Sequence, residues 1–576
     1  MNFLVMGGFF LTEALKLLGH RVVRAETFLP PGAAEVELAA VLAQLPAADR
    51  PDLLMVAENL EFPRHLPLNL ELIKIPRAFY ALDPHLNLYW HQKYAANFDC
   101  VFTTQRTSMS AFRGRGRPVH WLPWSVDLGV TFDHSLPRRY EIAFVGRVDP
   151  KTRRKRHLIL EALKSRVPLR VWGDRQDNEV SHQEMGRIYS QARVVVNEAI
   201  QGEVNLRVFE SLAAGALLLT EDVGPNLQGL FTPGEELITF GPQDLLEKAA
   251  YFLNHEGERQ AIAQRGRERV YAQHHTLARA RQFLEYLGEE DWAWQAPDHL
   301  LLGQTLLHLA FRGLYPLRLG IARATFHLQE ALRLHPASAP VYVTLGQLAL
   351  LSRDLEGALA AYDQALALDP GDFHVHILRG HLLRHQERPV AAAAAFRQGL
   401  KLARQIPYQL RREMRGLLPQ GMGTAAFLTC LGQIYEAQGL TLEPGYPPAP
   451  DPIFFTYAVE YYFRALELDP LYLPALQSLG RLQERHGFSC EAIACFERWT
   501  QLEPENPEAH WLLGQAQLKG YQPREGLKNL LLAQVLEPQR DLMDALRGLP
   551  LAPATLKTLL PQITAEELWP CQALPC

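Results

Sequence analysis

The second half of the chain repeats itself at a fixed interval. Prolines expected to end helices, and small residues expected inside helices, recur 34 residues apart. The prolines are Pro336, Pro370, Pro470, Pro504 and Pro538, three of whose successive intervals are 34 residues, and the glycine pairs are Gly346 with Gly380 and Gly480 with Gly514. A period of this length indicates stacked helical units, each contacting its neighbours, rather than one globular core.

The residue types within one unit fit a pair of antiparallel helices. Gly346 and Ala358 are small enough for the helices to approach closely, Tyr362 fills the space between units, and Pro370 ends the second helix. This pattern resembles the tetratricopeptide repeat over roughly residues 298–538, with about six units, two of them degenerate. The run TLEPGYPPAP interrupts one unit, and a longer linker lies around Gln405–Gln420. The resemblance implies a concave surface that binds peptides or proteins, and a scaffold that only makes dimers is the alternative.

The first half alternates short apolar runs with helical stretches, as parallel sheets covered on both faces do. The expected strands are Phe3–Met6, Leu53–Ala57, Cys100–Thr103, Ile142–Val145, Leu169–Trp172, Val194–Asn197 and Leu217–Thr220. The segment Pro118–Tyr140 is expected to be a hinge between two such sheets. The predicted fold class is α/β plus all-α, with two Rossmann-like domains followed by an α-solenoid. The expected domains are 1–135, 136–288, 298–538 for the repeats, and 539–576 for a capping tail.

Composition excludes several classes of protein. The formal charge of −5 in 576 residues gives no electrostatic reason to expect nucleic acid or an anionic membrane as partner. Six cysteines without a CxxC pair predict neither a disulfide framework nor a four-cysteine zinc site, so a reduced, cytoplasmic setting is expected. The first twenty residues lack a basic start, and Glu13 and Lys16 interrupt their apolar run, which favours a strand, turn and helix over a secretion signal. No run reaches the ~20 apolar residues of a membrane span.

The segment Gln201–Gly215, QGEVNLRVFESLAAG, contains the residues best suited to chemistry. It follows the apolar strand VVVN and is expected to start a helix near Val204, whose N-terminus favours phosphate. Arg207 would oppose the dipole of that helix unless an anionic ligand were bound. Glu210, three residues on, could accept hydrogen bonds from a ribose diol. An Arg–Glu pair on a solvated helix is an equally good interpretation of the spacing.

The longer run NLRVFE, followed by AAGALLLT, makes the comparison specific. It resembles the nucleotide-binding signature of group 1 glycosyltransferases of GT-B fold, closest to the spore-maturation-protein-B-like branch. Supporting runs are FTPGEELITF at 231–240, RGRERVYAQHHT at 265–276, FVGR at 144–147, DPH at 83–85 and FDCVFTT at 98–104. The similarity covers about residues 75–288 and implies sugar transfer from a nucleotide-activated donor. Many relatives carry two glutamates eight positions apart, but here Gly202 stands eight before Glu210 and Glu203 is displaced by one, so the stereochemistry stays open.

The resemblance assigns donor nucleotide-sugar binding to residues of the second α/β domain. They are Gly146, Arg147, Arg153, Arg154, Asn205, Arg207, Glu210, His275 and Thr276. Two alternatives stand beside this assignment. The basic run at 151–156 is also typical of a solvated face, and Thr276 is also a good helix N-cap.

A catalytic base is expected from the first domain. Asp83, His85 and Glu58 follow strands and could face the acceptor hydroxyl, although Asp83-Pro84 is also a turn signal. A retaining transfer would need no such base. No Asp-x-Asp stands where a metal-diphosphate site would be expected, so we expect no metal and no cofactor beyond the nucleotide sugar itself.

The leading hypothesis is a bacterial-type, metal-independent glycosyltransferase of the hexosyltransferase type. Its repeats would recruit the acceptor, for which a protein or peptide is the suggested class, and raise the local concentration of its hydroxyl groups. The combination resembles that of O-linked N-acetylglucosamine transferases in the opposite order, which supports it by analogy only. The alternative is a non-catalytic interaction scaffold with a decayed glycosyltransferase domain. A GT-B-fold epimerase acting on a nucleotide sugar ranks third.

Overall fold

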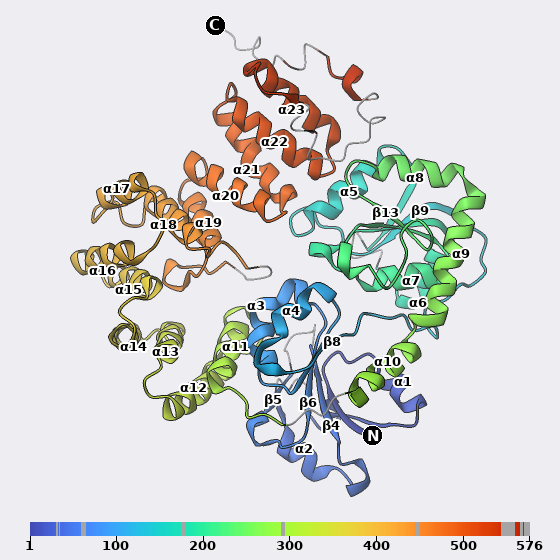
Figure 1. Cartoon of the computed structure of the whole chain (residues 1–576), viewed down its shortest axis with the longest axis horizontal. Helices are drawn as coiled ribbons and strands as arrows, with labels where there is room; N and C mark the ends of the chain where they lie inside the picture. Colours follow the sequence, from blue (N-terminus) through green and yellow to red (C-terminus); the bar gives the residue numbers. More distant parts are fainter. Residues whose placement is uncertain are drawn as a thin grey trace. The chain divides into compact units, whose positions relative to one another are not determined.

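The computed structural model describes residues 1–29, 33, 35–58, 65–173, 179–289, 294–443, 448–542, 546, 559–564 and 568. Figure 1 shows the elements coloured in chain order. The chain divides into two compact units, each built from separate segments. The first contains Met1–Trp124, Thr276–Gly423 and Cys430–Tyr461, and the second contains Ser125–His275, Thr424–Thr429 and Tyr462–Cys576.

The first unit contains a six-stranded parallel sheet in the order β2-β1-β4-β6-β7-β8. Its strands are β1 (Asn2–Met6), β2 (Arg21–Arg24), β4 (Leu53–Ala57), β6 (Arg77–Ala81), β7 (Cys100–Thr103) and β8 (Val119–Trp121). A separate pair joins β3 (Glu35–Glu37) to β5 (Leu66–Leu68). The helices are α1 (Thr12–Leu17), α2 (Leu38–Gln44), α3 (Pro84–Ala95) and α4 (Met109–Phe112). Central strands are buried along their whole length, as their continuous apolar runs predict.

The second unit contains a five-stranded parallel sheet in the order β10-β9-β11-β12-β13. Its strands are β9 (Tyr140–Val145), β10 (Leu169–Trp172), β11 (Ala192–Asn197), β12 (Leu217–Glu221) and β13 (Ile238–Phe240). The helices are α5 (Arg154–Lys164), α6 (His182–Ser190), α7 (Leu206–Ala213), α8 (Leu245–Asn254) and α9 (Glu256–Gln273). The two Rossmann-like sheets expected from the sequence are therefore present.

Helix α10 (Thr276–Glu289) belongs to the first unit, although it directly follows the second sheet's last helix. Its Phe283 ring lies 5.9 Å from the ring of Phe3, 5.6 Å from Phe9 and 5.0 Å from Phe102. The units therefore change at Trp124 and His275, which differs from the boundaries expected at 135 and 288. The cause is the apolar face of α10, which is buried against residues far away in sequence.

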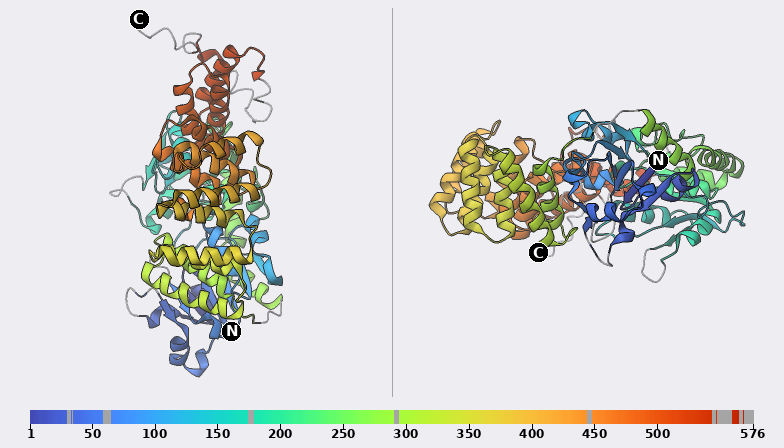
Figure 2. Two further views of the ribbon diagram at one scale, coloured as in Figure 1. Left: turned by 90° about the vertical axis from the view of Figure 1, so that its left-hand side faces the viewer. Right: turned by 90° about the horizontal axis from the view of Figure 1, so that it is seen from below.

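The repeats form six helix pairs in the described part of the chain, and the stacked pairs of the first unit are visible in Figure 2. The tetratricopeptide pattern is therefore confirmed. The pairs are α11 (His299–Phe311) with α12 (Leu317–Leu334), α13 (Ala339–Leu351) with α14 (Leu355–Leu368), α15 (Phe373–His385) with α16 (Pro389–Leu402), α18 (Ala425–Ala437) with α19 (Ala458–Leu468), α20 (Leu473–Arg485) with α21 (Ser489–Leu502), and α22 (Pro507–Lys519) with α23 (Pro523–Leu536). A separate helix, α17 (Tyr408–Gly416), lies in the expected linker.

The repeating glycines have the packing role that their spacing predicts. A Cβ placed on Gly346 would lie 2.4 Å from the Tyr362 ring, and one on Gly480 would lie 2.5 Å from the Phe496 ring. Both distances are below van der Waals contact, so only glycine permits the observed helix spacing. The same contact between a glycine and an aromatic ring therefore occurs in two of the repeats, α13/α14 and α20/α21.

The expected capping tail, 539–576, lies mostly outside the described residues. Its described residues Leu546 and Leu559 are buried in a cluster with Leu518, Leu527 and Leu530 of the last pair, and the capping role of the tail stays a prediction. Cys571 and Cys576 also lie outside the described residues, while the four described cysteines are free thiols. None of the helices in the described ranges is both long and apolar enough to cross a bilayer.

Candidate functional site

At the carboxyl edge of the second sheet, where its parallel strands end, two glycines leave the backbone without side chains. Gly146 follows β9 with a φ of 149°, and Gly173 follows β10 with a φ of 79°. A Cβ on Gly173 would lie 3.2 Å from the carbonyl carbon of Gly146, so side chains are disfavoured here. The Gly146 N–H donates to the Trp172 carbonyl at 2.9 Å. A ligand could therefore approach the main chain closely at this edge.

Arg207, in the first turn of α7, is fixed to this edge of the sheet. Its Nη2 donates to the Val145 carbonyl at 2.8 Å, and its Nη1 donates to Asn197 Oδ1 at 2.8 Å. The guanidinium carbon lies 4.5 Å from the centre of the Phe144 ring. A Cβ on Gly146 would lie 2.7 Å from Nη2 of Arg207, so a side chain at this position would displace the guanidinium from its observed place. The alternative of an Arg207–Glu210 ion pair on a solvated helix is therefore wrong: the guanidinium bonds the strand ends instead.

Glu210 lies one turn further along α7, with its side chain 12% exposed. Burial raises the pKa of this carboxyl group, while the nearby charges of Arg207 and His182 lower it. His182 Nδ1 lies 4.0 Å from Glu210 Oε1. A carboxylate in such poorly hydrated surroundings gains from hydroxyl donors, which is the chemistry expected for contact with a ribose.

Asn205 stands at the N-cap position of α7 and has an unsatisfied acceptor. Its Nδ2 donates to the Glu198 carbonyl at 3.3 Å. Its Oδ1 is buried and accepts no hydrogen bond in the described part of the chain. Buried acceptors of this kind are uncommon in folded proteins, and an O–H or N–H of a ligand would satisfy this one.

The basic side chains in and near the run at 151–156 lie in three different environments. Arg147, near the run, is exposed, and Arg153 is partly exposed just before α5. Arg154 Nη2 lies 3.9 Å from Glu497 Oε2 of α21, so this residue contacts the repeats. The residue that lies under the strand ends is Arg156, which the sequence-based site did not include. Its Nε donates to Glu198 at 2.9 Å and its Nη1 donates to the Arg147 carbonyl at 2.8 Å.

A second network joins the last repeat pair to the same edge. Glu221 Oε2, at the end of β12, accepts from the Ala199 N–H at 2.8 Å and lies 2.9 Å from Lys155 Nζ. Lys155 Nζ also donates to the Ala199 carbonyl at 2.6 Å. The Tyr521 hydroxyl, between α22 and α23, donates to Glu221 Oε1 at 2.7 Å. The loop that leads to Asn205 is therefore fixed partly by a residue of the repeats.

His275 and Thr276 lie where the chain passes between the units. His275 pairs with Val126 in an isolated parallel bridge, and α10 begins at Thr276, which assigns Thr276 to the first unit. The neighbouring His274 is the buried histidine, and its Nε2 lies 2.9 Å from the Leu230 carbonyl oxygen. The ranges of the two compact units therefore separate Thr276 from the other residues expected to bind the donor.

In the first unit, Glu58 organises the start of α3. Its Oε2 accepts from the Asp83 N–H at 2.8 Å, its Oε1 accepts from Asn87 Nδ2 at 2.7 Å, and its Oε2 lies 3.1 Å from His91 Nε2. The Glu58 side chain is buried. This geometry favours a positioning role for Glu58 over direct contact with an acceptor.

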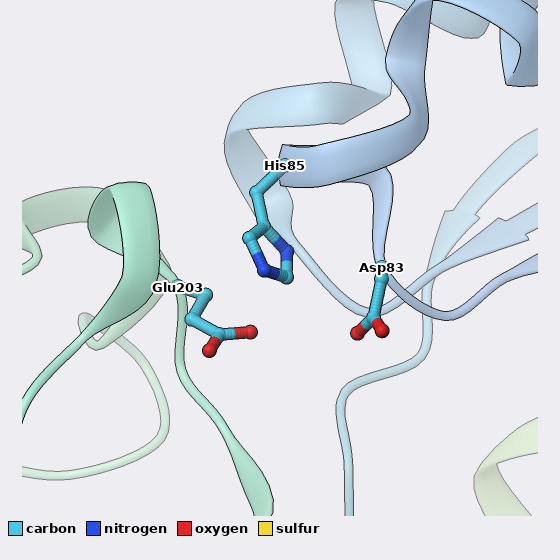
Figure 3. Close-up of side chains that lie close together, drawn as sticks. All are labelled: Asp83, His85 and Glu203. Atoms are coloured by element: carbon cyan, nitrogen blue, oxygen red, sulfur yellow. The ribbon is translucent and has the colours of Figure 1, made fainter. Parts of the chain in front are cut away.

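Figure 3 shows Asp83 and His85 projecting from the N-terminal end of α3, and both side chains are partly exposed. The third residue labelled there, Glu203, belongs to the second unit and precedes α7. Carboxylate and imidazole groups can hold a transition metal or act as a base. The roles assigned to Asp83 and His85 and the metal independence of the chain stay predictions.

Models of known families match segments of both the α/β part and the repeat part of the chain. The model of a glycosyl transferase-like family matches residues 153–285, and two models of the tetratricopeptide repeat match residues 321–382 and 478–520. The chain therefore contains a glycosyl transferase-like domain and C-terminal tetratricopeptide repeats. The finer assignment to the spore-maturation-protein-B-like branch stays a prediction.

Individual proteins show more distant similarity. The lipoprotein NlpI homolog of Haemophilus influenzae is 29% identical over 155 residues, which are 26% of this chain, and the chain spans less than half, 44%, of that curated relative. The structure of sucrose-phosphate synthase from Thermosynechococcus elongatus is 15% identical, covering 50% of this chain and 99% of that one, with a TM-score of 0.37. HepE of Anabaena, solved with UDP-glucose, is 14% identical, covering 50% and 100%, with a TM-score of 0.34.

Proposed function

We propose that this protein is a glycosyltransferase of the hexosyltransferase type. The second α/β sheet would bind a nucleoside diphosphate sugar, and the repeats would recruit a protein or peptide acceptor. One observation carries the proposal: Arg207 is held by Val145 and Asn197 at the carboxyl edge of a parallel sheet, beside the bare backbone of Gly146. The match to a glycosyl transferase-like family over residues 153–285 supports it.

The chemistry of sugar transfer explains why a cation would be fixed there. As the bond between sugar and diphosphate breaks, negative charge grows on the leaving phosphate oxygen. An Arg207 guanidinium already held by protein acceptors would stabilise that charge without reorganising, and the N-terminus of α7 would add its partial positive charge. This arrangement supplies charge that a metal provides elsewhere, so we propose metal-independent transfer.

The remaining residues would bind and orient the two substrates. Glu210 would accept hydrogen bonds from ribose hydroxyls, and the buried Oδ1 of Asn205 would accept another from the donor. On the acceptor side, Asp83 or His85 would accept the proton of the attacking hydroxyl, while Glu58 holds the backbone from which both project.

The test is thermal stability of the purified chain with UDP, GDP, dTDP or CMP, with magnesium or with a chelator. A nucleotide at 100 Kd stabilises its domain by about 2.7 kcal/mol, which is readily detected. We expect one nucleotide to act, equally with the chelator, and we expect Arg207→Ala and Glu210→Gln to remove the effect. Arg207→Lys keeps a cation for the case in which the alanine variant folds poorly.

The matched control is a variant that removes an arginine lying away from the proposed nucleotide site. Arg193, at the start of β11, pairs with Glu141 and Glu256 rather than with the carboxyl edge. Arg193→Gln should keep the full nucleotide shift. If no nucleotide stabilises the wild-type chain, the interaction scaffold with a decayed transferase domain becomes the better explanation. If a nucleotide sugar is converted without any acceptor, the epimerase alternative gains support.

A further inference from the structure

A cavity of about 290 Å³ lies within the first unit, where the repeats adjoin the first α/β sheet's helix α3. Lys93 of α3 lines it together with Gln304 of α11, Thr344 of α13 and Glu443 and Tyr457 of the segment that joins α18 to α19. Its volume is just below the range of about 300–1,000 Å³ typical of small-molecule pockets. One long side chain or a short peptide segment would fill it.

Acidic groups outnumber basic ones in this cavity. Three carboxylates line it, those of Asp369, Asp372 and Glu443, against the single ammonium of Lys93. Burial lowers the pKa of His308 to about 3, so this lining histidine is neutral at physiological pH. The cavity therefore has an excess of negative charge, which attracts a cation.

The carboxylates are oriented by bonds that leave further acceptor capacity. Asp372 Oδ1 accepts from the Val375 N–H at 3.1 Å, and Asp369 Oδ1 accepts from the Gly371 N–H at 3.0 Å. The other oxygen of each accepts no hydrogen bond among the described residues. These two aspartates can therefore accept hydrogen bonds from an ammonium or guanidinium group without losing their structural role.

An apolar surface completes the cavity. Ala339, Pro340 and Val343, at the start of α13, form part of its lining. Lysine and arginine side chains have this dual character, because an aliphatic stem packs on apolar surface while the charged end reaches polar groups. An acidic or purely apolar side chain would match only one part of the lining.

We propose that this cavity binds a lysine or arginine side chain of the acceptor polypeptide. The inference rests on the proposed function in one respect only, namely that the bound polypeptide is the acceptor of the sugar. Recognition of a basic residue would place neighbouring serine or threonine hydroxyls of the same segment beside the first α/β domain. The cavity would thus select acceptor segments by charge.

Peptide binding to the full chain tests the proposal. The probes are fluorescein-labelled seven-residue glycine-serine peptides with lysine, norleucine or glutamate at the centre, followed by fluorescence anisotropy. The lysine peptide should bind most tightly, norleucine should weaken binding about fivefold or more, and the glutamate peptide should bind least. Raising the salt concentration should weaken only the lysine peptide.

Charge-neutral variants keep the fold intact. Asp369→Asn and Asp372→Asn each retain an oxygen for the Gly371 or Val375 N–H, and asparagine is a good N-cap for α15. We expect the double variant to weaken the lysine peptide about threefold to fivefold or more, and Lys93→Gln to strengthen it by a similar factor. Asp363→Asn, on the exposed side of α14 beside Arg379, is the matched control.

The opposite changes expected of the aspartate and lysine variants make the test decisive. Equal affinity for the lysine, norleucine and glutamate peptides, or no response to either set of variants, would overturn the proposal. Stabilisation by a nucleotide, measured on the same samples, tests the donor site proposed for the second unit. If no nucleotide stabilises the chain but the lysine peptide still binds, the result counts against the proposed transferase activity and not against the cavity.

Discussion

Glu460 is a buried acid whose titration should affect the stability of the repeats. Its Oε1 accepts from the Ala449 N–H at 2.9 Å, and its Oε2 accepts from the N–H groups of Thr456 at 2.7 Å and Tyr457 at 2.9 Å. Burial nevertheless raises the pKa of Glu460 to about 7, from an ordinary value of 4.5. The folded state therefore holds the proton more tightly than the unfolded state does.

The sign of the pH effect follows from this difference. The stabilising contribution is fully present below about pH 4.5 and is lost as pH rises through 7, with a size of roughly 3 kcal/mol. The glutamine of Glu460→Gln is neutral at every pH. From pH 5 to pH 8, the free energy of unfolding of the wild type should therefore fall relative to that of the variant. Urea unfolding at both pH values measures it. For Glu467→Gln, exposed on the same helix, the difference from wild type should not change with pH, and parallel pH curves for wild type and Glu460→Gln would contradict the argument.

At the scale of elements, the turn between α22 and α23 should influence the donor site. The Tyr521 hydroxyl donates to the partly buried carboxylate of Glu221, which also accepts from the Ala199 N–H in the loop before α7. Tyr521→Phe should lower the stability of the second unit by about 1.5–3 kcal/mol, the contribution typical of a hydrogen bond to a charged group. If the turn positions the loop, nucleotide affinity should also fall several-fold.

The affinity measurement distinguishes positioning from a purely structural role. Tyr251→Phe is the matched control, because the Tyr251 hydroxyl donates to Glu258 at 2.9 Å on an exposed surface. That variant should change neither stability nor nucleotide affinity. A Tyr521→Phe variant that melts earlier but binds nucleotide as tightly as wild type would show that the turn only supports the fold.

Elements with local causes could be predicted from the sequence, whereas their partners could not. Gly346 and Tyr362 belong to the same repeat, so their contact could be predicted from the residue pattern of that repeat. The position of Arg207 follows from a strand and a helix that are adjacent in sequence. Its bonds to Val145 and Asn197 depend on how that helix packs on the sheet. The apolar face of α10 gave no sign that Phe283 meets the first sheet.

The basic run shows why the residues that contact the strand ends are hard to identify from sequence. Successive residues of a helix point about 100° apart, so the residue facing the sheet depends on where the helix begins. The sequence favoured Arg153 and Arg154, but α5 begins at Arg154, and Arg156 and Lys155 make the bonds at the strand ends. A shift of one or two residues thus decides which basic side chain contacts the strand ends, and the donor-binding role of Arg153 and Arg154 stays a prediction.

At the scale of the whole molecule, the repeats do not form a unit of their own. The pairs α11/α12, α13/α14 and α15/α16 belong to the unit of the first sheet, whereas α20/α21 and α22/α23 belong to that of the second. Each end of the repeat array thus shares a unit with one α/β sheet. Acceptor recognition and donor binding would then depend on different ends of the same array.

This division predicts two unfolding transitions, of which a nucleotide raises only one. Binding confined to the second unit stabilises that unit by about 2.7 kcal/mol at 100 Kd, and its transition should rise by about 5 °C or more. Differential scanning calorimetry measures both transitions. Arg207→Lys should reduce the shift while both transitions stay visible. A single transition, or two that rise together with nucleotide, would mean that the repeats couple both sheets into one cooperative structure, because continuous packing along the array would then transmit the stabilisation from one end to the other.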